Sequence, residues 1–329
     1  AKAFWNHRHC RWFSLYKKAA LLTAAGMCVL LFMISLLRDA VRSVGEAERK
    51  LDCRVLAEIR HERKYRTLRA ALRRKKSSIL ITEPLTSFSY TETIRTLRRK
   101  LEQHMPERGN TILITSALEN EGKSTIAVNL ALSLAQKHKR VLLVDCDLRK
   151  PACRKILEIP AVQHETLEVL RGTAAPGDAI VRASDTSTLS LLLQTQSVRN
   201  SSKFVSSSAM AAFLDAVRSR YDYVILDTPP MSAGSDAEAL AELADAAILV
   251  VRQNQAGTAL LRACVSTLRG TNAKLLGCVL NDCHASILSE QSSYGYGYGY
   301  GYGYGYGHYG HYGKYGKYGA YDAARKDGR

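Results

Sequence analysis

Residues 111–125 read TILITSALENEGKST, and this stretch decides the fold. Its first six residues suit a strand buried on both faces, and an amphipathic helical pattern follows the loop. Backbone N–H groups at such a helix start cradle phosphate, the lysine reaches the β- and γ-phosphates, and the hydroxyl oxygen binds Mg²⁺. Ala117 replaces the usual first glycine, but the strand–loop–helix context still predicts a phosphate-binding loop. The predicted nucleotide-binding residues in it are Gly122, Lys123, Ser124 and Thr125.

Strand and helix patterns alternate around this unit from about residue 86 to 288, which predicts an α/β fold. We expect a parallel sheet flanked by helices, of the P-loop NTPase type. The expected strands are 111–116, 141–145, 189–193, 223–227, 246–251 and 275–280, and the expected helices include 124–137, 210–220 and 258–269.

Three aspartates follow apolar strands. Asp145 and Asp147 lie in VLLVDCDLRKP (141–151), and Asp227 lies in YDYVILDTPP (221–230). Ligands of open α/β sheets gather at the carboxyl ends of strands, so these side chains should converge on the phosphate loop. A single aspartate there is often only a turn former, but three of them indicate Mg²⁺ ligands and a base. The predicted metal ligands are Ser124, Asp145, Asp147 and Asp227.

An uncharged stretch of nineteen residues, 19–37, predicts one transmembrane helix. At about 1.5 Å per residue it would be roughly 28 Å long, close to the thickness of a bilayer core. A nucleotide site needs cytosolic nucleotide, so the C-terminal side should be cytoplasmic. The chain starts at Ala1, and we expect residues 1–18, a basic lead, to end an extracytoplasmic part that is missing here. Residues 38–85 read as a charged juxtamembrane connector.

The formal net charge of +17 raises nucleic acid and anionic membrane as partners. Residues 60–76 hold nine Lys or Arg and one acid, without the interleaved aromatics of a nucleic-acid site. Beside a membrane span, anionic lipid is the expected partner, at roughly 1 kcal/mol per basic residue near the surface, and no nucleic acid is expected. The eight cysteines form no CxxC pair, and reduced thiols are expected.

The C-terminal tail, residues 289–329, is rich in tyrosine and glycine and predicted to be disordered, because it lacks the aliphatic residues of a core. A low-complexity adhesive tail is one interpretation. Beside a phosphoryl-transfer site, the tail is more simply that site's own substrate. Its twelve candidate phosphorylation sites are Tyr294, Tyr296, Tyr298, Tyr300, Tyr302, Tyr304, Tyr306, Tyr309, Tyr312, Tyr315, Tyr318 and Tyr321.

The GKS loop, the VDCDLRKP segment and the VILDTPP strand resemble the Walker A, A′ and B motifs of bacterial tyrosine kinases, the BY-kinases. The resemblance runs from about residue 38 to the C-terminus. It implies an autokinase in the bacterial cell membrane that uses ATP and Mg²⁺ and phosphorylates tail tyrosines in trans within a ring-shaped homo-oligomer. It also implies a role in capsular or exopolysaccharide polymerisation and export, with polysaccharide-assembly proteins and a protein-tyrosine phosphatase as partners.

The same resemblance implies roles for single residues. Lys123 and Ser124 would bind phosphate and Mg²⁺. Asp145 and Asp147 would divide metal contact and deprotonation of the tyrosine hydroxyl, in either order, and Asp227 would hold Mg²⁺ directly or through water. Asn281 is similar to an adenine-contacting asparagine, although a turn-forming Asn is equally consistent. Asn120 stands where many relatives have glycine, and Asn tolerates left-handed backbone.

A helix is expected from Ser89, whose hydroxyl would form a capping box with Glu92. Glu92, Arg95 and Arg98 have an ExxRxxR spacing similar to the BY-kinase motif that joins subunits into a ring. A plain solvated face is the alternative interpretation.

Two other functions remain open at this point. One is a ParA/MinD-like positioning ATPase, although that group carries a signature lysine near the start of the loop, where this chain has Ala117. The other is an adaptor that only binds nucleotide, which the intact Lys123, Asp145, Asp147 and Asp227 argue against. Eukaryotic-type kinases are excluded, since no HRD or DFG motif occurs.

Overall fold

The structure is a computed structural model that describes residues 16–31, 33, 39–62, 78–184, 187–199, 201–205 and 207–284. The chain divides into two units, Ala1–His284 and Ala285–Arg329. The second unit, which holds the twelve candidate tyrosines, lies outside the described residues. So do positions 63–77, which include most of the predicted lipid-binding run, residues 60–76.

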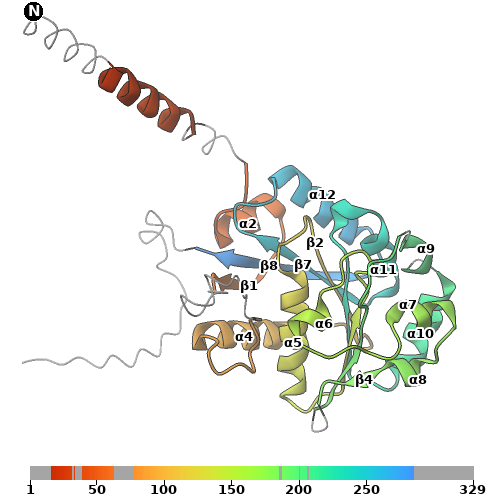
Figure 1. Ribbon diagram of the computed structural model, residues 1–329. Coiled ribbons are helices and arrows are strands. Elements are labelled where there is room, and N and C mark those ends of the chain that lie inside the picture. The colour runs from red at the N-terminus through yellow and green to blue at the C-terminus, as the bar shows by residue number, and fades with distance from the viewer. Residues whose placement is uncertain are drawn as a thin grey trace, which may run out of the picture. The chain divides into compact units, whose positions relative to one another are not determined.

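An eight-stranded sheet forms the centre of the first unit, in the order β1-β8-β7-β2-β6-β3-β5-β4 (Figure 1). All neighbouring strands are parallel except β4 and β5. The α/β prediction and all six expected strands are therefore confirmed. The strands are β1 Val55–Arg60, β2 Thr111–Ser116, β3 Val141–Asp145, β4 Val181–Arg182, β5 Leu189–Leu192, β6 Tyr223–Asp227, β7 Ala246–Arg252 and β8 Lys274–Cys283.

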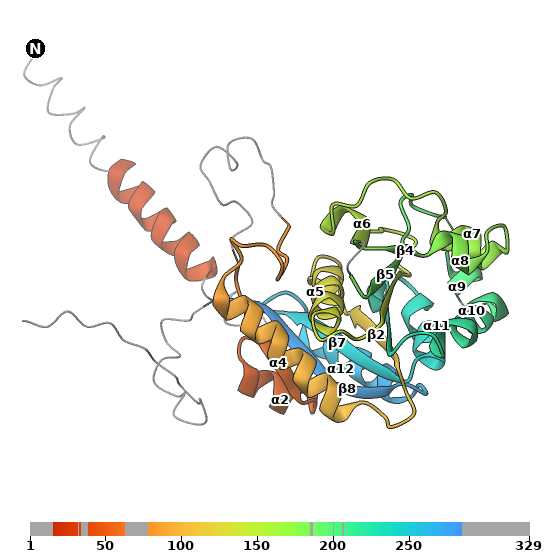
Figure 2. The ribbon, with the colours of Figure 1, turned by 90° about the horizontal axis from the view of Figure 1, so that it is seen from below.

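Helices cover both faces of the sheet, because alternate residues of each central strand point to opposite sides. In β2, Leu113 joins one buried core, while Ile112 and Ile114 join the other. The first core is covered by α2, α7, α10, α11 and α12, and the second by α4 and α5, which lie side by side (Figure 2). The helices are α2 Val44–Leu51, α4 Phe88–His104, α5 Lys123–Ala135, α6 Cys153–Ile156, α7 Thr166–Arg171, α8 Pro176–Ala179, α9 Ser202–Val205, α10 Ser208–Arg218, η1 Met231–Ala233, α11 Asp236–Leu243 and α12 Thr258–Arg269.

The folded domain begins earlier than the sequence analysis predicted. Residues 44–60, which were assigned to the connector, form α2 and β1. Strand β1 pairs with β8, more than 200 residues away, with Val55 opposite Cys278. Leu56 and Ile59 of this strand are buried. The strand was not predicted from the sequence, because the charged residues within and beside it interrupt the apolar pattern.

The predicted capping box of α4 is wrong. Ser87, not Ser89, caps the helix, and its hydroxyl accepts a hydrogen bond from the N–H of Tyr90 at 3.2 Å. Glu92 instead forms an ion pair with Arg95 one turn further on (2.5 Å). Two serines stand near this helix start, and the contact of Ser87 with Glu62 favours the first (2.7 Å).

Residues 16–31 are helical. Among the residues that the structure describes, no helix is both long enough and apolar enough to cross a membrane. The transmembrane helix predicted for 19–37 is therefore not confirmed, and positions 32 and 34–37 of it lie outside the described residues.

Candidate active site

The phosphate loop connects the end of β2 with the first turn of α5, and its backbone has the shape that the sequence requires. Gly122 has φ 94°, and a Cβ added there would lie 2.2 Å from Asn281 Nδ2, so only glycine fits. Asn120 has φ 63°, which confirms that asparagine supplies the left-handed turn in place of glycine. The free N–H groups at the start of α5 therefore face the site with no side-chain cap across them.

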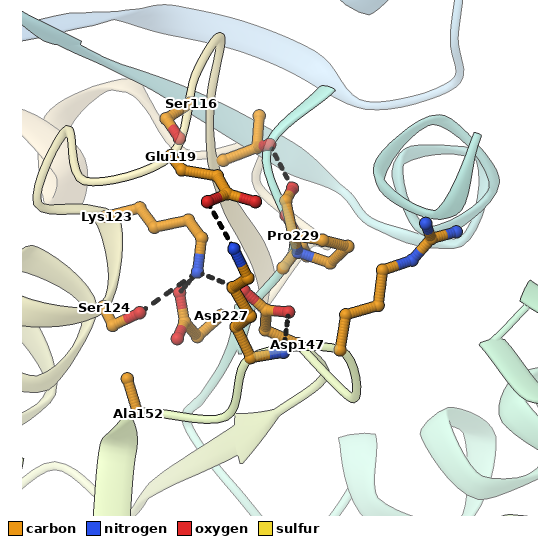
Figure 3. A network of polar contacts seen from close by, with 12 residues as sticks. Ser116, Glu119, Lys123, Ser124, Asp147, Ala152, Asp227 and Pro229 are labelled. Atoms are coloured by element: carbon orange, nitrogen blue, oxygen red, sulfur yellow. Dashed lines mark hydrogen bonds and ion pairs between the residues drawn. The ribbon is translucent and has the colours of Figure 1, made fainter. Parts of the chain in front are cut away.

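Lys123 lies among the polar contacts of the site (Figure 3), close to the ends of the parallel strands β2, β3 and β6. Its Nζ is 2.7 Å from Asp147 Oδ2, 3.5 Å from Asp227 Oδ1 and 3.1 Å from Ser124 Oγ. Burial opposes the charge on Lys123, but the negative charges of Asp227 and Asp147 outweigh it and raise the pKa of the ammonium group. The two carboxylates therefore stabilise the cationic form of Lys123, which can pair with an anion.

Asp145 and Asp227 lie directly opposite each other at the ends of β3 and β6, and both are fully buried. Asp145 Oδ2 accepts N–H bonds from Ala152 (3.2 Å) and Cys153 (3.1 Å). Asp145 Oδ1 has no hydrogen-bond partner among the described residues. Burial, followed by the charge of Asp227, raises the pKa of Asp145 well above its usual range. An unpartnered buried carboxylate oxygen beside a second carboxylate fits a hard cation such as Mg²⁺.

A cavity of about 850 Å³ opens on this cluster and is large enough for a nucleotide. The exposed ion pair between Lys150 Nζ and Glu119 Oε2 (2.5 Å) joins the phosphate loop to the segment after β3 at the cavity wall. The lining comprises Glu119, Asn120, Gly122, Lys123, Ser124, Thr125, Asp147, Arg149, Lys150, Ala152, Ile156, Pro229, Pro230, Ala233 and Arg252. Asp147 thus faces the cavity, whereas Asp145 and Asp227 lie beneath it.

Asn281 lies behind the phosphate loop and is not part of the described cavity lining. Its Nδ2 donates to the carbonyl oxygen of Glu121 at 2.8 Å, so the side chain supports the loop from β8. The adenine contact implied by the family resemblance stays a prediction.

Glu121 is a buried carboxylate inside the phosphate loop that sequence reasoning missed. Its Oε2 accepts from the N–H of Leu118 (2.8 Å) and its Oε1 from the N–H of Arg252 (3.4 Å). The Arg252 guanidinium donates to the carbonyl of Asn120 (3.3 Å), so the end of β7 fixes the loop twice. Burial raises the pKa of Glu121 to about 7, against the backbone N–H bonds that lower it. No local pattern predicts that this residue is buried, because one of its two partners, Arg252, comes from the end of β7.

Glu121 should make the stability of the protein depend on pH. A raised pKa in the folded state means that stability is lost as pH rises from about 4.5 through about 7. Glu121→Gln cannot ionise, so its free energy of unfolding should fall less than that of the parent over this range, with a difference of up to about 3 kcal/mol. The difference is measured as a smaller drop in melting temperature with rising pH. The exposed Glu119→Gln is the control. Parallel pH profiles for parent and Glu121→Gln would contradict this assignment.

The three predicted interface residues on α4 do not share one environment. Glu92 and Arg95 lie at the surface and pair with each other. Arg98 is only 7% exposed, and its Nη1 donates to the carbonyl oxygen of Ser133 on α5 at 3.2 Å. Arg98 therefore connects two helices of its own chain.

Two further residues beside the site have contacts that the sequence analysis did not predict. Cys153 Sγ donates to Asp227 Oδ2 at 3.4 Å and so packs against the buried side of the carboxylate cluster. Arg149, in the same segment as Asp147, pairs with Asp236 (3.1 Å) and donates to the carbonyl of Ala233 (2.6 Å). It fixes the segment after β3 to the start of α11.

Known proteins resemble this chain over the same region. A family model described as an AAA domain matches residues 110–275. Tyrosine-protein kinase YwqD of Bacillus subtilis is 34% identical over 224 residues, covering 68% of this chain and 93% of YwqD. Succinoglycan biosynthesis transport protein ExoP of Rhizobium meliloti is 32% identical over 222 residues, 66% of this chain but only 28% of ExoP.

Among solved structures, the chimerical protein CapA2B2 superposes with a TM-score of 0.64 at 28% identity, covering 74% of this chain and 100% of that one. The kinase domain of the Escherichia coli tyrosine kinase ETK gives a TM-score of 0.65 at 25% identity, covering 79% and 99%. Together with the phosphate loop and the aspartate-ended strands, these similarities show that the chain belongs to the family of bacterial tyrosine-protein kinases.

Proposed function

We propose that this chain transfers the γ-phosphate of ATP to tyrosine hydroxyls, above all those of its own tail. The observation that carries the proposal is the charged Lys123 among three carboxylates at the floor of the 850 Å³ cavity. Phosphoryl transfer needs little covalent chemistry from a protein. It needs fixed charges around the transferring group, and this cluster supplies them.

The residues fit ATP and Mg²⁺. The N–H groups at the start of α5 would hold the β-phosphate, and Lys123 would exchange its contacts with Asp147 and Asp227 for the γ-phosphate. Ser124 Oγ and Asp227 would hold the metal, and the unpartnered Oδ1 of Asp145 would complete its ligands. When bound, Mg²⁺ neutralises charge on the phosphate oxygens.

Asp147 is the better candidate for the base, because it lines the cavity whereas Asp145 is sealed beneath it. In this proposal the phenol oxygen attacks the γ-phosphorus, the bond to the bridging oxygen breaks, and ADP leaves. The phenolic proton passes to an Asp147 oxygen once Lys123 has turned to the phosphate. The hydrogen bond from Lys150 N to Asp147 Oδ1 (3.0 Å) would orient the carboxylate.

The tail is the proposed substrate because of its length and composition. A random-coil segment as long as residues 294–329 would have a typical end-to-end distance of about 30–36 Å and would reach on the order of 120 Å when extended. It can therefore enter the site of a neighbouring copy. Each phosphotyrosine adds about −1.5 to −2 charges, so twelve would add roughly −18 to −24 and offset the chain's +17. We propose that this charge separates the subunits.

Replacing all twelve tail tyrosines by Phe should remove most phosphate incorporation and leave the oligomer intact in ATP and Mg²⁺. A single tail Tyr→Phe should change little, because total charge is the variable. Phosphate is located by mass spectrometry, and assembly is followed by sedimentation before and after ATP. If the all-Phe chain dissociates as the parent does, tail charge does not drive disassembly. If the parent chain hydrolyses ATP but forms no phosphotyrosine, the result favours a positioning ATPase over a kinase.

We propose that Glu92 and Arg95 contribute to contacts between copies in a ring. Glu92→Ala with Arg95→Ala should lower the oligomer mass in light scattering and slow tail phosphorylation several-fold, because both charges are accessible on α4. Arg99→Ala, an exposed arginine on the same helix, is the control. Arg98 is left unchanged, since its removal would break the contact with Ser133. An unchanged mass in the double variant would rule out this face.

The cellular setting is proposed from composition and from the names of the relatives. The apolar stretch 19–37 would anchor the chain as a single pass in a bacterial cell membrane, with the kinase domain in the cytoplasm. The basic run at 60–76 would face anionic lipid. The match to a succinoglycan biosynthesis transport protein supports a role in exopolysaccharide or capsule export. Polysaccharide-assembly proteins and a protein-tyrosine phosphatase stay predicted partners, from the family resemblance alone.

A further inference from the structure

Two histidines and an aspartate meet where β1 and β8 end, outside the active site. His61 follows β1, and Asp282 and His284 lie at the end of β8. One donor atom from each lies within 4.8 Å of the other two. His61 Nδ1 is 2.6 Å from Asp282 Oδ1, and the two imidazole rings are stacked with centroids 4.5 Å apart. The proposed kinase reaction uses none of these side chains.

The backbone holds the three residues in this arrangement. The N–H of His61 donates to the carbonyl of Cys283 (2.9 Å), and the N–H of His284 donates to Gln253 Oε1 (2.8 Å). Asp282 has φ 58°, a left-handed conformation that costs free energy in a residue other than glycine unless its surroundings impose it. Residues with such backbone strain cluster at functional sites and ligand clamps.

The donor set matches a transition-metal site. Two imidazole nitrogens and one carboxylate oxygen are the ligands of open zinc sites, in which water takes the fourth position. Zinc–ligand bonds of about 2.0–2.2 Å put two ligand atoms of a tetrahedral ion about 3.3 Å apart. To hold an ion, the 2.6 Å contact between His61 and Asp282 would have to open slightly, and the exposed His284 side chain would have to rotate toward them.

Asp282 also has the outer partner that metal-ligating carboxylates have. Its Oδ2 forms an ion pair with Arg252, which leaves Oδ1 directed at the imidazoles. Arg252 in turn donates to the carbonyl of Asn120 in the phosphate loop. A metal at Oδ1 therefore leaves the contact with Arg252 in place.

We propose that His61, Asp282 and His284 bind one Zn²⁺ ion. The ion would join the end of β1 to the end of β8, one residue before the tyrosine-rich tail unit begins. Mg²⁺ at the active site would not compete, because imidazole ligands favour zinc and carboxylate oxygens favour magnesium. Each site should therefore select a different metal.

The test is isothermal titration of metal-free, untagged full-length chain with ZnCl₂. Other histidines such as His308 can also bind zinc, so the quantity of interest is a difference. The parent should bind one more equivalent than His61→Gln with His284→Gln. His164→Gln is the matched control, since His164 pairs with a single carboxylate, Glu168 (3.0 Å), and should bind as the parent does.

Two further measurements keep the test decisive. Co²⁺ should give the visible absorption of a four-coordinate site in the parent, and this absorption should be lost in the double variant. Asp282→Asn, which keeps the size of the side chain, should weaken zinc binding by at least about tenfold if the double variant does not fold. Equal zinc stoichiometry in the parent and a folded double variant would overturn the proposal, and so would unchanged affinity in Asp282→Asn.

Discussion

Lys123→Met is expected to reduce tyrosine autophosphorylation at least about 100- to 1000-fold. Lys123 is the buried cation that the site offers to the transferring phosphate, and losing one such preorganised charge costs about this much in rate. The measurement is phosphotyrosine formed by purified chain in ATP and Mg²⁺. Lys137→Met, an exposed lysine just beyond the C-terminal end of the same helix, should act as the parent does.

The same substitution should also destabilise the metal-free protein. In the resting site Lys123 compensates Asp147 and Asp227, and removing one partner of a buried charge cluster typically costs about 3–5 kcal/mol. Protonation of the remaining carboxylates would lower this cost, so the loss should shrink at acid pH. Circular dichroism must therefore confirm a folded variant before its activity is read. Phosphorylation at the parent's level in folded Lys123→Met would refute the kinase assignment.

Asp145→Asn should abolish transfer and at the same time stabilise the metal-free protein near neutral pH. The activity falls because an amide replaces a carboxylate that the site needs for its cation. The stability rises because the pKa of Asp145 is raised by burial and by Asp227. A raised folded-state pKa means that the parent loses stability as pH rises above the ordinary aspartate range, and Asn removes this loss.

The control for Asp145→Asn is Asp222→Asn, because the pKa of Asp222 is shifted in the opposite direction, downward. Asp222 accepts two hydrogen bonds from Arg140, which outweigh its slight burial and lower its pKa. Its contribution to stability is present above the usual aspartate pKa and is lost as pH falls. Asp222→Asn should thus be active and no more stable than the parent at neutral pH. If Asp145→Asn melts at a lower temperature than the parent at pH 8, burial and the charge of Asp227 do not destabilise the ionised form of Asp145.

The sequence by itself determined the central strand–loop–helix unit and the three aspartates at strand ends. These features depend on patterns a few residues long, such as an apolar strand followed by a glycine-lysine-serine turn. The same local reasoning placed six strands correctly, because strands buried on both faces are apolar throughout. It also placed the left-handed turn at Asn120, where backbone preference alone decides.

Only the tertiary structure decided which groups meet across the chain. Strand β1 belongs to the sheet because it pairs with β8, and Arg98 is buried because α5 lies against it. Asn281 supports the phosphate loop, and Glu121 is held by the end of β7. His61 contacts Asp282, which lies 221 positions further along the chain. Contacts between such distant segments leave no periodic mark in the sequence, since they depend on how whole elements pack and not on the preference of any one residue.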